Sequence, residues 1–222
     1  MAAGMRALPE PVLLWLAALC GFIILAAFAS IYDRFPADLW LMHRFQDVES
    51  SAFASTLNRA ADAASGWGPA VAVAIGAAIL FLAQRRLPAL LLLLAPAASA
   101  LNATVKEIVD RPRPGHELVP WSTRTYTSAF PSGHAESAIV IYGLLFYFIT
   151  VFVSQRTLRL LGQAACLWVI LFTGMQRVYT GVHWPSDVLG GYYLGGLVLA
   201  VIIGLHRYLS RTTVTDRSES RY

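Results

Sequence analysis

Charged residues are scarce in this chain of 222 residues. Asp, Glu, Lys and Arg together make up only 14% of it, whereas apolar residues reach 57%. Soluble domains carry about 25% charged residues, and one of this size could not bury so much apolar surface. The composition therefore excludes an ordinary soluble domain and favours a protein whose solvent is a lipid bilayer.

Cysteine and lysine are also nearly absent. The two cysteines, Cys20 and Cys166, both fall inside apolar runs, so we expect free thiols and no disulfide framework. Lys106 is the only lysine. The net charge is +4, but many of the arginines stand in short connections between apolar runs. That pattern indicates membrane topology, and we expect no nucleic-acid partner.

Six apolar stretches are long enough to cross a membrane as helices. Each has about 17–20 residues, near the length that spans about 30 Å of hydrocarbon, and none alternates like a strand of a membrane barrel. The stretches are 12–31, 67–83, 87–105, 135–153, 160–178 and 188–205. We therefore predict an all-α integral membrane bundle of six helices over residues 1–206. A basic cytoplasmic tail, 207–222, is expected to be disordered.

The first stretch also contains Ala27-Phe28-Ala29, which looks like a signal-peptidase site. The apolar run before it is longer than the usual run of about 7–15 residues, and Arg6 is its only basic flank. We therefore expect this helix to be retained. Residues 37–50 are amphipathic, which favours either a helix in the membrane interface, anchored by Trp40 and Phe45, or a short soluble cap over the bundle.

The basic residues predict the orientation of the bundle. The connections 84–86 and 154–159 carry two arginines each, and the tail 207–222 carries four. By the positive-inside rule these segments lie in the cytoplasm with the N-terminus. The opposite side then carries eight basic residues, against nine on the cytoplasmic side. Five of those eight belong to the segments described next or lie beside them, and without these five the excess on the cytoplasmic side is clear.

Three segments on the non-cytoplasmic side hold polar residues suited to chemistry. They are residues 106–114, 131–134 and 177–187. The cations Lys106, Arg113 and Arg177 would be costly together unless an anion joins them, and their side chains suit phosphate oxygens. Ser132 and Gly133 stand where the fourth helix begins, and there free backbone N–H groups and the helix dipole favour an anion.

Two histidines, His134 and His183, flank the expected anion site. One can attack phosphorus while the other protonates the leaving oxygen. Asp187 follows His183 by four residues and can accept a hydrogen bond from one of its ring nitrogens. That bond would fix the tautomer and leave the other ring nitrogen free to react.

These segments resemble the three-part signature of the type 2 phosphatidic acid phosphatase family, in particular its bacterial membrane lipid phosphatases. The signature is Lys, six residues and Arg-Pro, then Pro-Ser-Gly-His, then Ser-Arg, five residues, His, three residues and Asp. The matching positions are Lys106 with Arg113-Pro114, residues 131–134, and Arg177 with His183 and Asp187. One position departs, because Gln176 replaces the usual Ser, and this puts the fine substrate preference in doubt.

The resemblance implies a role for each matching residue. It implies that His183 is the nucleophile that forms a phosphohistidine, that Asp187 orients it, and that His134 is the general acid. The phosphate ligands implied are Lys106, Arg113, Ser132, Gly133 and Arg177. No cofactor and no metal are expected, because these cations stabilise the transferred charge as Mg²⁺ would.

The substrate implied is a lipid phosphate or pyrophosphate, namely undecaprenyl pyrophosphate, phosphatidylglycerol phosphate or phosphatidic acid. The site would face the periplasm or exterior of the plasma membrane, and the lipid would enter sideways between helices. The oligomeric state is left open, and so is phosphotransfer to an acceptor other than water. A transporter or non-catalytic scaffold is the alternative that intramembrane polar residues such as Asn102 and Gln163 support. Against it, the polar residues concentrate at one surface, whereas a transport path should also place them at the midplane. Vanadate-dependent haloperoxidases have a similar site but are soluble.

Three further positions carry weaker expectations. We expect Arg111 to pair with its neighbour Asp110 rather than to face the substrate. Glu136 fits the first turn of a helix, where the dipole stabilises an acid, although a proton relay to the nearby histidine is the alternative. The spacing of Gly191 and Gly195 predicts close helix packing without a chemical role.

Overall fold

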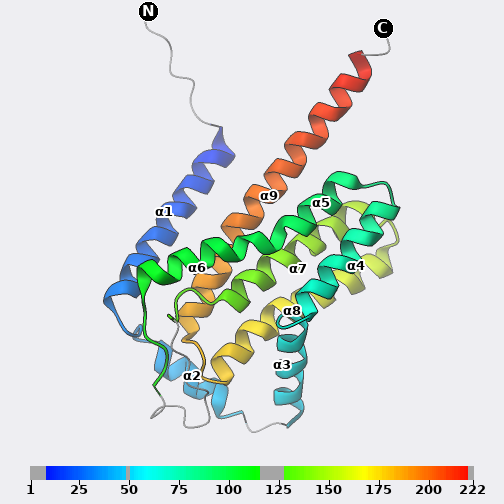
Figure 1. Cartoon of the computed structure of the whole chain (residues 1–222). Helices are drawn as coiled ribbons and strands as arrows, with labels where there is room; N and C mark the ends of the chain where they lie inside the picture. The colour runs from blue at the N-terminus through cyan, green and yellow to red at the C-terminus, as the bar shows by residue number, and fades with distance from the viewer. Residues whose placement is uncertain (1–8, 49–50, 116–127, 220–222) are drawn as a thin grey trace, which may run out of the picture.

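The structure, a computed structural model of the whole chain, describes residues 9–48, 51–115 and 128–219. All regular structure in these residues is helical, which confirms the all-α prediction (Figure 1). The elements are α1 (Glu10–Ile31), α2 (Asp38–Gln46), α3 (Ser51–Ala63), α4 (Gly68–Leu82), α5 (Arg86–Leu94), the 3₁₀ segment η1 (Ala95–Ala97), α6 (Ala98–Val109), α7 (Gly133–Phe152), α8 (Arg156–Tyr179) and α9 (Pro185–Glu219).

The described residues contain five helices long and apolar enough to cross a membrane, and a sixth span if α3 and α4 count as one. The third span runs through α5, η1 and α6 as one stretch of 24 residues, with Pro96 inside the 3₁₀ segment. Helix α4 has 15 residues, so it is only about 22 Å long. Helix α3 precedes it and is bent from it by 58°. With this pair counted as one span, the described residues hold the six predicted spans, and the second includes a helix that the apolar pattern did not indicate.

Helix α9 is longer than expected. It continues through Glu219, well beyond the predicted end of the sixth span at residue 205 and into the expected tail. No glycine or proline follows Gly204, so nothing in the local sequence stops the helix there.

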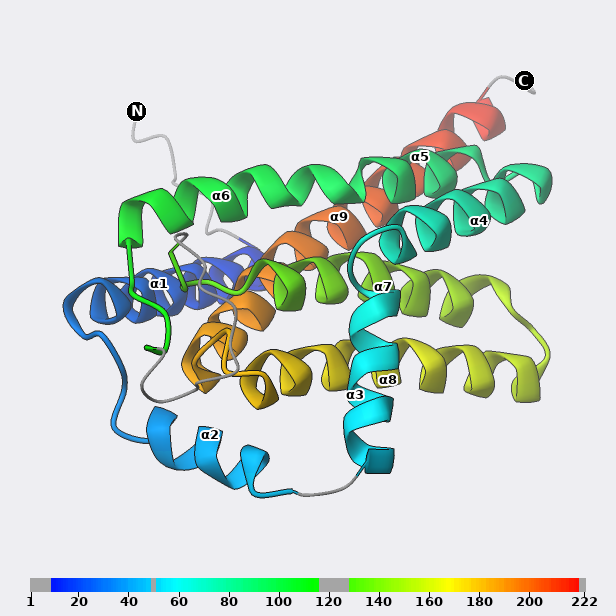
Figure 2. The same ribbon diagram turned by 60° about the horizontal axis from the view of Figure 1, so that its bottom comes forward.

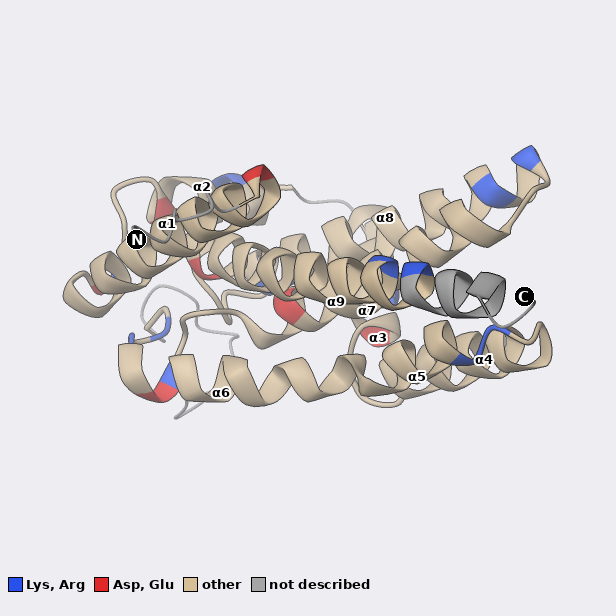
Figure 3. Ribbon diagram, turned by 90° about the horizontal axis from the view of Figure 1, so that it is seen from above, with Lys and Arg blue, Asp and Glu red and all other residues tan. Residues whose placement is uncertain are grey.

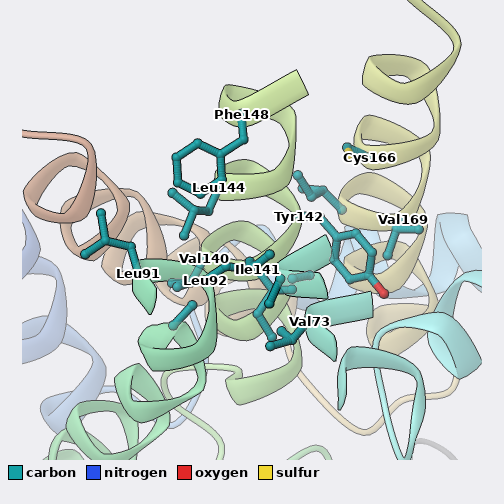
Figure 4. Packing of buried hydrophobic residues seen from close by; sticks show 14 of the residues in the cluster. Val73, Leu91, Leu92, Val140, Ile141, Tyr142, Leu144, Phe148, Cys166 and Val169 are labelled. Atoms are coloured by element: carbon teal, nitrogen blue, oxygen red, sulfur yellow. The ribbon is translucent and has the colours of Figure 1, made fainter. Parts of the chain in front are cut away.

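Helix α7 lies at the centre of the bundle and contacts α4, α5, α6, α8 and α9. Its Leu144 and Phe148 are almost fully buried, in one apolar cluster with Leu92 of α5 and Val169 of α8 (Figure 4). On the outer helices large apolar side chains point outward instead, as with Leu82 of α4, which is 79% exposed. Such exposed apolar surface is what a bilayer covers.

Helix α2 lies across one end of the bundle, where it contacts α8 and α9 (Figure 2). Met42 on its inner face is fully buried, and Phe45 packs against the same small cluster, whereas Trp40 is 60% exposed. The helix therefore caps the bundle with one face and keeps an aromatic side chain outside, which combines the two expectations for residues 37–50.

Basic residues stand at both ends of the bundle, α2 itself included. At the end away from α2, Figure 3 shows them in the α4–α5 connection, at the beginning of α8 and on α9. These are the segments that the positive-inside rule assigned to the cytoplasm. The end of α6 and the chain beyond it, which also carry basic residues, lie toward the other end of the bundle.

Candidate active site

The second and third motifs are joined directly at the end of the bundle that α2 covers. The backbone N–H of Ser132 donates to the carbonyl of Asp187 at 2.9 Å, which ties the start of α7 to the start of α9. Gly191 allows this close approach, because a Cβ there would collide with the carbonyl oxygen of Ser132. Gly195 meets α7 one turn further on, against the carbonyl of Glu136. The predicted packing role of the two glycines is confirmed.

A cavity of about 530 Å³ opens beside this junction. Its polar wall comes from all three motifs together with α6 and α7, and consists of Asn102, Lys106, Arg113, Gly133, His134, Ser137 and His183. Its other wall is mostly apolar and comes from the α3–α4 turn, the first turn of α4, η1 and α7, with Ala64, Pro69, Ala70, Pro96 and Ile141. The cavity can therefore hold a polar group on one side and hydrocarbon on the other.

His183 lines the cavity and is buried against Asp187. Its side chain is 3% exposed, and its Nδ1 lies 3.6 Å from Oδ2 of Asp187, slightly longer than a hydrogen bond. Catalytic hydrogen bonds are often long before substrate binds. Because Nδ1 faces the carboxylate, Nε2 is the nitrogen left for the cavity. Burial lowers the pKa of His183 to about 4, against the opposing effect of Asp187, so the ring is neutral at pH 7.

Two of the predicted cations line the cavity and are held there by backbone carbonyls. Lys106, in the last turn of α6, donates from Nζ to the carbonyl of Ser128 at 2.9 Å. Arg113 donates from Nη1 to the carbonyl of Val182 at 2.9 Å. Both lie within electrostatic range of His183 and of His134, so the cavity wall has a positive potential.

Arg177 and Ser132 lie next to the cavity but do not line it. Arg177 lies in the last turn of α8, within electrostatic range of His134 and Arg113, and its Nε is buried with no partner among the described residues. The hydroxyl of Ser132 is likewise buried and unpartnered within that part of the chain. Since buried donors are normally satisfied, an anion in the cavity is a natural partner for such groups.

Gln176, which stands where the family signature has Ser, turns away from the cavity. Its Nε2 lies 3.5 Å from Oδ1 of Asn58 on α3. Gln176 therefore contacts α3, and it is not among the residues that line the cavity.

The expectation for Arg111 was wrong. Its side chain is fully buried, and its guanidinium contacts Asp38 and Asp187, not Asp110. Asp110 ends α6 in the left-handed conformation, with φ of 44°, and the chain turns there. Arg111 consequently points inward, under the site, and lines no part of the cavity.

Glu136 is fully buried in the first turn of α7. Its Oε2 accepts from the hydroxyl of Ser137 at 3.2 Å, and its Oε1 has no partner among the described residues. The two expectations for this residue, an acid stabilised by the helix dipole and a proton relay, both stay predictions. In the described part of the chain no three side chains of His, Cys, Asp or Glu stand close enough together to hold a metal ion.

Motif reasoning alone missed several residues of this region. Asp38, Arg111 and Ser186 form a buried polar network behind His183, and Asn102 packs beside Gly133 in the cavity wall. Asp38 stands far from the motifs along the chain and carries no local signal. Arg111 and Ser186 lie within the motif segments, but their contact joins residues 75 positions apart, so only the folded chain shows that they belong to this network.

A helical membrane bundle with a cation-lined cavity and a buried, neutral histidine backed by a carboxylate defines a membrane phosphatase. The chain belongs to the PAP2 superfamily, whose family model matches residues 86–211. This agrees with the resemblance read from the motifs.

Individual relatives agree with this family. The chain is 33% identical to phosphatidylglycerophosphatase B of Bacillus subtilis (strain 168) over 142 residues, which are 63% of this chain and 68% of that protein. It is 32% identical to decaprenylphosphoryl-5-phosphoribose phosphatase of Mycobacterium tuberculosis over 110 residues, about half of each protein (47% and 53%). The crystal structure of a transmembrane PAP2-type phosphatidylglycerolphosphate phosphatase from Bacillus subtilis superposes with a TM-score of 0.70 at 22% identity. That superposition covers 87% of this chain and 96% of the other, and supports the fold.

Proposed function

We propose that this phosphatase hydrolyses the phosphate ester or anhydride of a membrane lipid through a phosphohistidine on His183. The observation that carries the proposal is the cavity into which Lys106, Arg113, His134 and His183 converge from three separate segments. Its polar half suits a phosphoryl group, and its apolar half suits the first part of a lipid tail.

In the proposed reaction, Nε2 of His183 attacks phosphorus while the bond between phosphorus and the leaving oxygen breaks. His134 gives its proton to that oxygen, and the lipid alcohol or lipid monophosphate departs. Asp187 stabilises the positive charge on the His183 ring across the contact at Nδ1. Water then attacks the phosphohistidine and gives its proton to His134, which releases inorganic phosphate and restores both histidines.

The cations supply the electrostatic part of this catalysis. Charge on the equatorial phosphoryl oxygens is stabilised by Lys106, Arg113 and Arg177 and by the backbone N–H groups at the start of α7, beside Ser132 and Gly133. Groups fixed in place before the reaction need no reorganisation when the charge develops. Lys106 and Arg113 meet this condition because backbone carbonyls already hold them.

The substrate we propose is undecaprenyl pyrophosphate, phosphatidylglycerol phosphate or phosphatidic acid. The names of the two relatives support this group, since one acts on a phosphoglycerolipid and the other on a polyprenyl-linked phosphate. We further propose that the chain is a multi-pass protein of the plasma membrane with its site on the periplasmic or extracellular face, because the arginine-rich connections lie at the other end of the bundle.

Release of inorganic phosphate by the purified protein tests the proposal. The panel comprises the three lipids above, each measured for phosphate and for the lipid product, with His183→Ala as the inactive control. We expect at least one lipid to be hydrolysed, with equal amounts of phosphate and dephosphorylated lipid. If lipid product exceeds phosphate, the phosphoryl group passes to another acceptor. If no lipid is turned over, or His183→Ala is as active as the unmodified protein, the proposal is wrong.

A further inference from the structure

Arg111 stands at the centre of a buried ionic network beneath the site. Its Nη1 donates to Oδ1 of Asp187 at 2.6 Å, and its Nη2 donates to Oδ2 of Asp38 at 3.0 Å. Its Nε donates to the carbonyl of Tyr32 at 3.2 Å, and Nη1 also reaches the hydroxyl of Ser186 at 2.8 Å. The side chains of Arg111 and Asp187 are 0% exposed and that of Asp38 is 3% exposed. A guanidinium so fully engaged is not available to a phosphate in the cavity.

Asp38, the first residue of α2, holds both the guanidinium and the beginning of α9. Its Oδ1 accepts from the backbone N–H of Ser186 at 2.9 Å, and its Oδ2 accepts from the Ser186 hydroxyl at 2.7 Å. Oδ2 also accepts from the backbone N–H of Phe35 at 2.7 Å. Because Ser186 precedes Asp187, a single carboxylate fixes the backbone beside Asp187 and, through Arg111, its side chain.

These contacts leave the Asp187 carboxylate only one orientation. Arg111 occupies Oδ1, and the backbone N–H of Trp184 donates to Oδ2 at 2.8 Å. The remaining lone pair of Oδ2 faces Nδ1 of His183. Asp187 is thus aimed at the ring nitrogen that must carry a proton if Nε2 is to attack.

We propose that α2 belongs to the catalytic apparatus, with Asp38 acting through Arg111 as the positioning residue for Asp187 and His183. The proposal rests on the function proposed for His183. Asp38 lies outside residues 86–211, which match the family model, so it belongs to a part of the chain that the family motifs do not cover. It does not line the cavity, and the hydrogen bonds of its side chain go to Phe35, Arg111 and Ser186, none of which lines it.

Asp38→Asn tests this role, because it preserves the shape of the side chain and removes its charge. With p-nitrophenyl phosphate as substrate, we expect kcat to fall about 10- to 100-fold, the size of loss that a misplaced catalytic group produces. KM should stay within a factor of about two, since Asp38 does not reach the cavity. The control is Asp33→Asn, the same change at an exposed residue of the α1–α2 connection, which should behave as the unmodified protein.

A double-mutant cycle separates positioning from a merely structural role. If Asp38 acts through Asp187, the variant with both Asp38→Asn and Asp187→Asn should be no slower than Asp187→Asn alone. If Asp38 is only structural, the two losses in kcat should multiply and the proposal fails. It also fails if Asp38→Asn has the unmodified kcat.

Should Asp38→Asn not accumulate in the membrane, Ser186→Ala replaces it. That change deletes the hydroxyl that joins Asp38 to Arg111 and leaves both charges in place. We expect a several-fold lower kcat that again disappears in the Asp187→Asn background, and an unchanged kcat overturns the proposal. Failure of the function proposed for His183 is seen separately, as activity in His183→Ala.

Discussion

Gly191 of α9 lies directly against the carbonyl oxygen of Ser132, so closely that a Cβ at residue 191 would overlap this oxygen. The same Ser132 donates its backbone N–H to the carbonyl of Asp187. This contact between two backbones sets where the start of α7, with Gly133 and His134, stands relative to the loop that carries His183.

Gly191→Ala should therefore both destabilise the protein and lower its activity. Forcing a methyl group into a packed junction costs about 1–3 kcal/mol, and the shift would move Ser132 and His134 away from His183. The measurements are the midpoint of thermal unfolding in detergent and kcat with p-nitrophenyl phosphate.

Gly196→Ala provides the matched control. Nothing lies within 4 Å of a Cβ at residue 196, so this change adds the same methyl group to the same helix without a collision. It should leave activity unchanged and stability equal or slightly higher, because alanine is the better helix former. Equal behaviour of the two variants would show that the α7–α9 contact does not set the site.

The two histidines should differ in how they depend on the leaving group. His134→Ala should lose about 10²–10⁴ in rate with an alkyl phosphate, since general acid catalysis is worth that much. With p-nitrophenyl phosphate the leaving oxygen needs little protonation, so the loss should be far smaller. His43→Ala, at an exposed position of α2, is the control and should match the unmodified protein. Equal losses of His134→Ala on the two substrates would mean that His134 has another role.

The sequence predicted the helical class, the membrane spans and the residues of the cavity better than it predicted the connections between them. Apolar runs long enough to span a bilayer form helices there, because a helix satisfies its own backbone hydrogen bonds. The fixed spacing within the three motifs identified the residues that line the cavity. Helix α3 was not predicted, because its sequence mixes small and polar residues and contains no apolar run, although it precedes α4 directly. The end of α9 was predicted too early, although no glycine or proline after Gly204 would end the helix there.

Partners that meet only in the folded chain could not be read from local patterns. Pairing Arg111 with Asp110 was the natural expectation for adjacent opposite charges. The left-handed turn at Asp110 instead sends Arg111 beneath the site, where Asp38 and Asp187 hold it. The partners of Arg111 are thus set by tertiary contacts with Asp38 and Asp187, which lie 73 and 76 residues from it along the chain.

The orientation in the membrane can be measured with single cysteines. In a variant that lacks Cys20 and Cys166, Asp33→Cys and Thr157→Cys place exposed thiols at opposite ends of the bundle. A membrane-impermeant thiol reagent applied to intact cells should label residue 33 and should label residue 157 only after permeabilisation, because two arginines flank Thr157. The reverse pattern would put the site in the cytoplasm.

Activity should survive removal of divalent metal ions. Lys106, Arg113 and Arg177 supply the positive charge that phosphoryl transfer requires, and Asp187 is engaged by Arg111 and Trp184. Turnover in EDTA should therefore equal turnover in Mg²⁺, with the protein prepared free of metal in both cases. Loss of activity in EDTA that Mg²⁺ restores would contradict catalysis by these cations alone.

The most direct test of the account is the identity of the residue that carries the phosphoryl group during turnover. The protein is mixed with p-nitrophenyl phosphate, quenched in alkali, which preserves phosphohistidine, and mapped by mass spectrometry. We predict one phosphoryl group on His183, labile to acid and absent from His183→Ala. It should accumulate further in His134→Ala, because the water that attacks it then lacks its base. A phosphoryl group on another residue, or full turnover by His183→Ala, would contradict the account.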